Sequence, residues 1–278
     1  MIRRARAAAR VPDDVAYPTK NELALEALNR VREWGVGTRV VLADTGFGTS
    51  HDFRAVLTAR GLPYCVQVAA SVNGWAACPG TPPPHTGHGR PAQRPPTDSI
   101  PASHDLPTLA VGLPRTAWRT ITWRQGTKWA LWSRFTSTAF WPAHGVSSRG
   151  PLPAVPVQLL IEWPADETAP IKYWLADVPH EALGLRRLVR LAKGRWRIEQ
   201  DYRELKDELG LDHFEGRSWP GWHHHVTLAS MAYAFLVFET LRARKKNGRR
   251  DAPRGPTRAA SAADPPRPVV SDVPAPLA

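Results

Sequence analysis

Arg195-Trp-Arg-Ile-Glu199-Gln-Asp-Tyr202-Arg203-Glu-Leu-Lys206 places one acidic residue between two basic residues at helical spacing. At about 100° per residue, Glu199 and Lys206 fall within about 40° of Arg195, so the three side chains share one stripe of a helix. An apolar stripe lies beside it and contains Leu191, Ile198, Leu205 and Leu209. Glu199 is therefore expected at the edge of the apolar stripe, with a half-sheltered carboxylate. The plainer alternative is an amphipathic helix with ion pairs between residues four apart.

The composition points to a polyanionic partner. The chain has 278 residues, a net charge of +12 and 12 Trp. Positive charge suits a phosphate backbone, and flat indole rings suit stacked bases. A genome rich in G and C would also raise the Arg, Ala and Pro content without any function. We expect DNA as the partner.

The cysteines and the apolar runs of the sequence indicate its cellular location. Cys65 and Cys78 have neither metal-ligand spacing nor a disulfide framework around them, which is typical of a reduced, intracellular chain. The longest uninterrupted apolar run, Met231 to Phe238, is too short to cross a bilayer. We therefore expect no membrane span and a cytoplasmic, bacterial location. The basic residues 1–10 are predicted to be disordered.

The N-terminal part predicts alternating helices and strands. The predicted elements are a helix over 21–34 capped by Thr19, a strand over 38–43, a helix over 51–60 capped by Ser50, and a strand over 63–68. This order predicts layered α/β structure with a parallel pair of strands. Sites lie beyond the carboxyl ends of parallel strands, so Asp44 is expected at a site.

The rest of the chain changes character after a Pro-, Gly- and His-rich loop over 77–107. Four aromatic and β-branched runs predict an antiparallel β insert: 118–124, 132–141, 157–163 and 171–175. A helix carrying Glu199 is predicted over 181–209, and an apolar helix over 221–244. The expected division is 18–70 for the first α/β part, 71–179 for linker and insert, 180–247 for the helical second part, and 248–278 for a disordered tail.

The signature around Glu199 resembles that of DDE-type transposases of the bacterial insertion-sequence group. Their signature is Tyr, two residues, Arg, three residues, Glu, six residues, Lys. Arg195, Glu199 and Lys206 fall at the required steps, whereas Ala192 occupies the Tyr position. The flanking residues 196–219, and the motif Leu42-Ala-Asp-Thr-Gly-Phe-Gly48, are similar to the branch numbered seven-zero-one. The resemblance covers roughly residues 11–244.

The resemblance implies an RNase H-like fold whose α/β layers are interrupted by the β insert. It assigns two catalytic, metal-binding carboxylates to Asp44 and Glu199, with Mg²⁺ or Mn²⁺ as cofactor for DNA strand cleavage and transfer at insertion-sequence ends. It also implies DNA contacts from Arg195, Tyr202 and Lys206 on the helix. The insert is expected to add contacts from Trp123 and Arg124.

The first Asp of such enzymes has no counterpart before Asp44, because Asp13 and Asp14 lie in a polar loop pattern. We therefore expect an N-terminally truncated transposase that lacks its first strands and is inactive alone. It would associate with DNA, with itself or with the full-length enzyme. The alternative is a non-catalytic DNA-binding product that interferes with the full-length enzyme. A basic RNA-associated scaffold is a third reading, which leaves the spacing around Glu199 unexplained.

Overall fold

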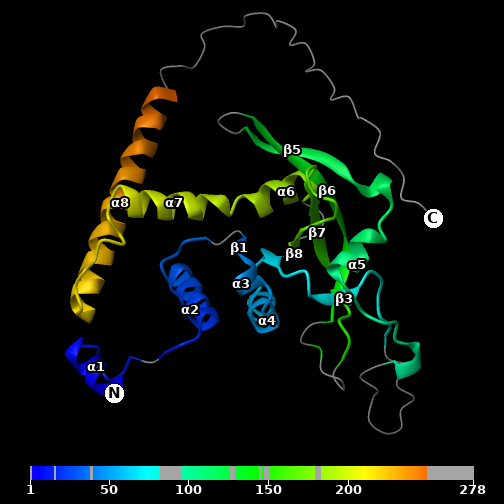
Figure 1. The fold of residues 1–278 in the computed structure, drawn as a ribbon, viewed down its shortest axis with the longest axis horizontal. Helices are drawn as coiled ribbons and strands as arrows, with labels where there is room; N and C mark the ends of the chain where they lie inside the picture. Colours follow the sequence, from blue (N-terminus) through cyan, green and yellow to red (C-terminus); the bar gives the residue numbers. More distant parts are fainter. Residues whose placement is uncertain are drawn as a thin grey trace, which may run out of the picture.

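The computed structural model describes residues 2–15, 17–37, 40–81, 95–125, 129–143, 146, 151–178 and 183–248. Within these residues an eight-stranded sheet has the order β1-β2-β8-β7-β6-β3-β4, with β5 paired to β6 (Figure 1). The strands are β1 (Val41–Ala43), β2 (Tyr64–Val68), β3 (Asn73–Trp75), β4 (His104–Asp105), β5 (Arg119–Gln125), β6 (Ala130–Pro142), β7 (Val157–Trp163) and β8 (Lys172–Asp177). β1 and β2 are parallel and the other pairs are antiparallel. The predicted parallel pair and the four strands of the antiparallel insert are confirmed.

Helices surround this sheet. They are α1 (Ile2–Ala8), α2 (Lys20–Glu33), α3 (Thr45–Gly48), α4 (His51–Ala59), α5 (Leu106–Val111), α6 (Leu185–Lys193), α7 (Trp196–Asp207) and α8 (Trp219–Gly248), with 3₁₀ turns η1 (Thr97–Ser99) and η2 (Arg115–Ala117). Both predicted caps are confirmed. Thr19 forms a capping box with Glu22, and the Ser50 hydroxyl accepts the Phe53 N–H at 3.3 Å.

The β1–β2 part of the sheet is covered on both faces. Successive residues of a strand point to opposite faces, so Val41 and Leu42 belong to different apolar clusters. The cluster of Val41 includes residues of α2 and α4, and the cluster of Leu42 includes residues of α6. This is the layered α/β arrangement expected from the sequence.

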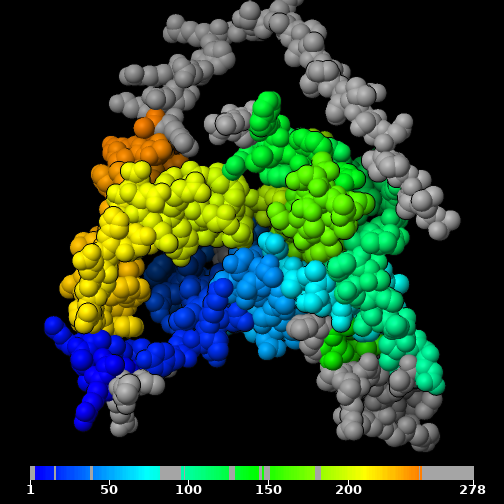
Figure 2. Space-filling model, viewed as in Figure 1, coloured from blue at the N-terminus to red at the C-terminus, as the bar shows by residue number. Residues whose placement is uncertain are grey.

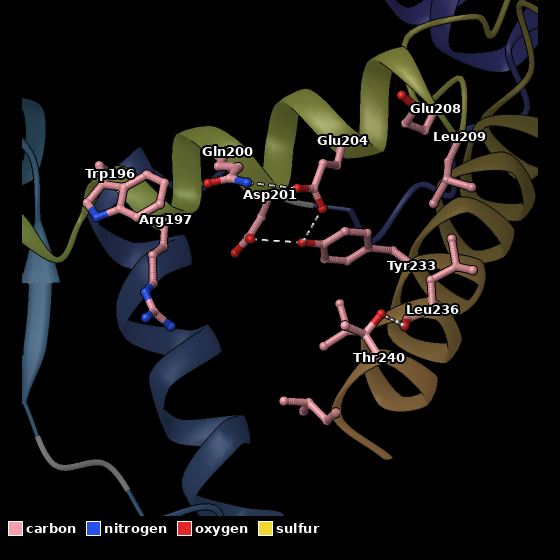
Figure 3. Close-up of a pocket in the computed structure, with 12 residues that line it drawn as sticks. Trp196, Arg197, Gln200, Asp201, Glu204, Glu208, Leu209, Tyr233, Leu236 and Thr240 are labelled. Atoms are coloured by element: carbon pink, nitrogen blue, oxygen red, sulfur yellow. Dashed lines mark hydrogen bonds between the residues drawn. The ribbon is translucent and has the colours of Figure 1, made fainter. Parts of the chain in front are cut away.

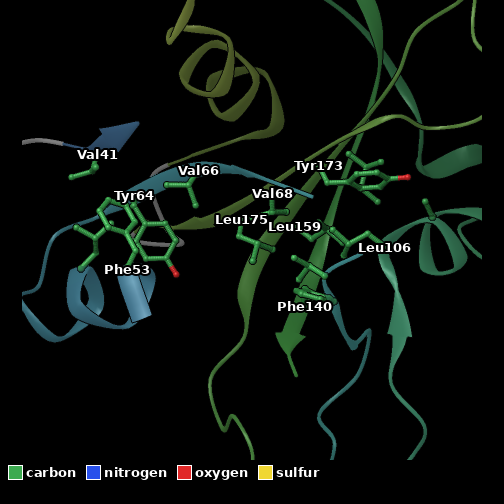
Figure 4. Packing of buried hydrophobic residues seen from close by; sticks show 14 of the residues in the cluster. Val41, Phe53, Tyr64, Val66, Val68, Leu106, Phe140, Leu159, Tyr173 and Leu175 are labelled. Carbon is green, nitrogen blue, oxygen red and sulfur yellow. The ribbon is translucent and has the colours of Figure 1, made fainter. Parts of the chain in front are cut away.

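The insert continues the same sheet. β2 lies between β1 and β8, with Val66 opposite Leu175. Figure 4 shows one row of buried apolar side chains that extends from Val41 and Phe53 to Phe140. The two segments expected over 18–70 and 71–179 therefore share a sheet and an apolar core.

Three elements differ from the expectation. The helix predicted over 181–209 is divided into α6 and α7 at Gly194 and Arg195. The segment 1–10 contains α1 rather than disorder, and the backbone oxygen of Ala9 accepts the Trp219 N–H at 2.7 Å. The described part of the loop over 77–107 contains η1 and β4, and α5 begins at its end. The tail from residue 249 onward lies outside the described residues.

Most large apolar side chains of α8 are exposed, although we expected the run from Met231 to Phe238 to contribute to a core. Met231, Phe235 and Phe238 are all exposed, and Ala229 is the buried hydrophobic residue of this helix among the described side chains. The faces of the sheet are already covered by α2, α4 and α6, so α8 extends beyond them (Figure 1). By length and composition, Trp219–Ala243 is the one helix of the described part able to cross a bilayer. This is weak evidence for a membrane span, because a helix that packs in a protein interface has a similar composition.

Candidate nucleic-acid interface and carboxylate site

Asp44 follows β1 directly and caps the short helix α3. Its Oδ1 accepts the Gly46 N–H at 2.9 Å. The turn is held against β2, because a Cβ on Gly48 would lie only 2.1 Å from the backbone oxygen of Gln67. The buried guanidinium of Arg54 donates to the backbone oxygen of Gly48. The Asp44 carboxylate is thus fixed at the carboxyl end of a parallel strand, as predicted.

The helix that carries Glu199 follows α6, which packs near β1. A Cβ on Gly194, the last residue before the α6–α7 junction, would lie 3.5 Å from Leu42 Cδ1. α7 begins two residues later, so the helix that carries Glu199 starts beside the strand that ends in Asp44.

The carboxylate of Glu199 pairs with the Arg195 guanidinium, four residues earlier, as the spacing predicts. Its side chain keeps 60% of its exposure, so the expected half-shelter is wrong. None of the residues of α7 is buried, because this helix leaves the sheet and extends toward α8 (Figure 1). Tyr202 and Lys206 are also exposed on α7, so the structure leaves all three side chains open to a ligand.

Trp123 and Arg124 both face the helices. The pairing of β5 with β6 skips Trp123, since Thr122 lies opposite Trp132 and Arg124 opposite Leu131. Such a bulge lets two consecutive side chains point to one side. Trp123 is half-buried and its ring lies 4.5 Å from Lys193 Nζ. The Arg124 guanidinium stacks at 3.9 Å on the ring of Trp196, the first residue of α7.

The same hairpin exposes two indole rings that the sequence did not single out. Trp129 retains 79% of its exposure and Trp132 retains 47%. Arg119 and Arg134 lie on the two strands of this hairpin. Exposed indole rings on a hairpin that also carries arginine offer a surface for stacking nucleic-acid bases.

A buried ion pair joins α6 to the insert. Lys193 Nζ lies 2.5 Å from Glu162 Oε2, and the Glu162 side chain keeps only 3% of its exposure. The rings of Trp123, Phe135 and Trp174 surround the ammonium. Burial lowers the pKa of Lys193, and the neighbouring carboxylate partly opposes that effect. Through this contact the strands of the insert hold α6, and α6 sets the start of α7.

A groove of about 690 Å³ separates α7 from α8 (Figure 3). Its α7 side carries the carboxylates of Asp201, Glu204 and Glu208, and apolar side chains of α8 form much of the other side. The Tyr233 hydroxyl donates to Asp201 Oδ1 at 2.8 Å and approaches Glu204 Oε2 at 3.4 Å. Desolvation and these two carboxylates raise the pKa of Tyr233 to about 12. Figure 2 shows the surface recessed below α7.

The described residues do not form a complete metal site. No group of three or more His, Cys, Asp or Glu side chains in the described ranges gathers closely enough to hold an ion. Asp44 is hydrogen-bonded to its own turn, and Glu199 is paired with Arg195. A divalent cation that bridges two phosphate oxygens needs several oxygen ligands, so these two carboxylates require additional donors.

Residues 2–129 match the family model described as DDE superfamily endonuclease. The matched segment contains β1, Asp44 and all of β5, and it ends before β6, α6 and α7. No curated protein matches the chain. The mixed α/β fold with a mostly antiparallel sheet is consistent with the fold of DDE nucleases, and the match shows similarity to that group over residues 2–129. DDE nucleases act on DNA and typically use divalent metals.

Proposed function

We propose that this chain is the DNA-binding part of a DDE-type transposase of the insertion-sequence group, in the branch numbered seven-zero-one. Its layers would be RNase H-like, with Asp44 and Glu199 as the second and third carboxylates of the parent enzyme. The parent reaction is metal-dependent DNA strand cleavage and transfer in the bacterial cytoplasm. The observation that supports this best is the position of Gly194 near Leu42 of β1, where a Cβ would lie 3.5 Å from Leu42 Cδ1. The helix α7 with Glu199 follows directly after this position, and β1 ends directly before Asp44.

The α7 surface would bind the DNA backbone. Arg195 and Lys206 carry positive charge on the stripe that includes Glu199, and Tyr202 is exposed on the same helix. An arginine can donate two hydrogen bonds to the oxygens of one phosphate, and a lysine acts as a point charge. Trp123 and Arg124 would support this surface by fixing the hairpin against α6 and α7, while Trp129 and Trp132 offer rings for stacking.

We expect this chain to bind DNA without cleaving it, because β1 is an edge strand of the described sheet and the first of the three carboxylates has no counterpart. In the described residues β1 pairs only with β2, so its other edge has unpaired N–H and C=O groups. We infer that further strands complete the sheet there and supply the missing carboxylate for Mg²⁺ or Mn²⁺. The same free edge favours the second candidate, a chain that associates with a full-length transposase and interferes with it.

Gel-shift titrations with duplex DNA test the binding. We expect binding that survives chelation of divalent cations and weakens steeply with salt, because counterions are released. Lys206→Met should lower the slope of log K against log salt by about 0.9. Arg30→Met, which removes an exposed charge already paired with Glu26, is the matched control. Weak binding that is indifferent to salt would contradict the proposal, and preference for RNA would favour an RNA-associated scaffold instead.

Cleavage assays test the expected inactivity. The purified chain should neither nick nor join DNA in Mg²⁺ or Mn²⁺, since two carboxylates leave the metals undersupported. Metal-dependent cleavage that disappears in Glu199→Ala would show that the described residues already form a working site.

A further inference from the structure

Lys20 brings a positive charge to the turn that carries Asp44. It is the first residue of α2, directly after the cap Thr19. Its ammonium lies 4.1 Å from the centroid of the Phe47 ring. A methyl group at Cβ of Gly46 would lie 2.8 Å from Lys20 Nζ and 3.2 Å from Asp44 Oδ1. The ammonium and the carboxylate therefore converge on the space that glycine leaves open.

Apart from its contact with the Phe47 ring, the ammonium of Lys20 has no ion-pair partner among the described residues. The N-terminus of a helix carries partial positive charge, so a lysine in the first turn opposes the helix dipole. The side chain is exposed, and within the described residues no acidic group lies within the 4.0 Å of an ion pair. Its N–H bonds are available to an external acceptor beside Asp44.

Lys20 begins α2, which packs on one face of the sheet, whereas Arg195 follows α6, which packs on the other face. α2 packs in the cluster that contains Val41, and α6, which leads to Arg195, packs in the cluster that contains Leu42. The hard, compact ammonium is suited to a single phosphate oxygen.

We propose that Lys20 binds a backbone phosphate of DNA beside Asp44, and that Gly46 leaves the space in which the ammonium lies close to this carboxylate. This inference rests on the proposed function, since the phosphate belongs to the DNA that the chain binds. It adds α2 to the binding surface, which the signature around Glu199 does not include.

Salt titrations of DNA binding test this residue. Lys20→Met keeps the apolar stem and should lower the slope of log K against log salt by about 0.9, the value for one lost phosphate contact. Lys20→Arg should restore the slope. Arg30→Met removes the same charge from the same helix, and its slope should equal that of the wild type.

Gly46→Ala provides an independent variant that leaves the lysine in place. The added methyl group would meet the mobile end of Lys20 rather than the backbone, so the slope should fall as in Lys20→Met while thermal unfolding stays near that of the wild type. If the wild-type chain binds DNA and Lys20→Met has the same slope of log K against log salt as the wild type, the inference about Lys20 is wrong while the proposed function stands. Absence of salt-dependent binding by the wild-type chain overturns the proposed function together with it.

Discussion

The ammonium of Lys193, on α6, lies 2.5 Å from the carboxylate of Glu162, on β7. This pair connects the insert to the helix that leads into the signature stretch. Removing one partner of a buried pair costs more than the pair contributes, because the other charge is left unpaired.

Lys193→Met should therefore destabilise the fold by about 3–5 kcal/mol, as measured by urea unfolding. The double variant Lys193→Met with Glu162→Leu should recover most of the lost stability. Apolar side chains at both positions would pack well among the aromatic rings of Trp123, Phe135 and Trp174. Arg30→Met breaks an exposed pair and should change stability by less than about 1 kcal/mol. Equal effects of Lys193→Met and Arg30→Met would show that the pair is solvated in solution.

A substitution at Gly48 tests whether close packing on β2 holds the turn that positions Asp44. Its missing side chain lets α3 lie on β2, and a Cβ would overlap the backbone oxygen of Gln67 at 2.1 Å. We expect Gly48→Ala to destabilise the chain by about 1–3 kcal/mol, because backbone must shift to admit the methyl group. Gly37→Ala meets nothing within 4 Å and should be near neutral. Matching unfolding midpoints for the two variants would contradict the close contact.

The two thiols differ in burial, and for Cys65 this has a consequence for stability at high pH. Burial raises the pKa of Cys65 to about 12, whereas Cys78 is exposed. Because the folded pKa of Cys65 exceeds the unfolded one, its contribution to stability is complete below about pH 8.5 and is lost as the pH rises toward 12. A thiol reagent should label Cys78 at once and Cys65 only on unfolding. Labelling of Cys78→Ser as fast as that of the wild type would contradict the burial of Cys65.

Local patterns predicted the elements that depend on local physics. The caps at Thr19 and Ser50, the parallel pair and the strands of the insert all follow from turn chemistry and from the spacing of apolar residues. The ion pair of Arg195 with Glu199 follows from helical spacing alone.

Features that depend on distant packing could not be predicted in this way. The break at Gly194 accompanies its close approach to Leu42, which lies 152 residues earlier in the numbering. The bulge at Trp123 reverses the alternation of side chains, so an indole expected to contact DNA faces Lys193 instead. The apolar run of α8 has the composition of a core helix, and only the positions of the other helices show that it stays exposed.

The free edge of β1 gives the last prediction. β1 ends the sheet in the described residues, and the exposed apolar side chains of α8, including Met231 and Phe235, add a second unpartnered surface. Unpaired strand edges and exposed apolar side chains favour association with another chain. We therefore expect the purified chain to be marginally stable and to self-associate, as measured by light scattering and thermal unfolding.

Adding the N-terminal segment of a transposase of the same group in trans should raise both the solubility and the unfolding temperature, because its strands would pair with β1 and cover apolar surface. A segment of the same composition with its apolar and polar positions exchanged is the control, since it cannot present an apolar face to the sheet. If that segment also supplies an acidic residue beside Asp44, metal-dependent cleavage should appear and should be lost in Glu199→Ala. A soluble monomer with a sharp, cooperative melt and no gain from the added segment would show that the edge of β1 needs no further strand.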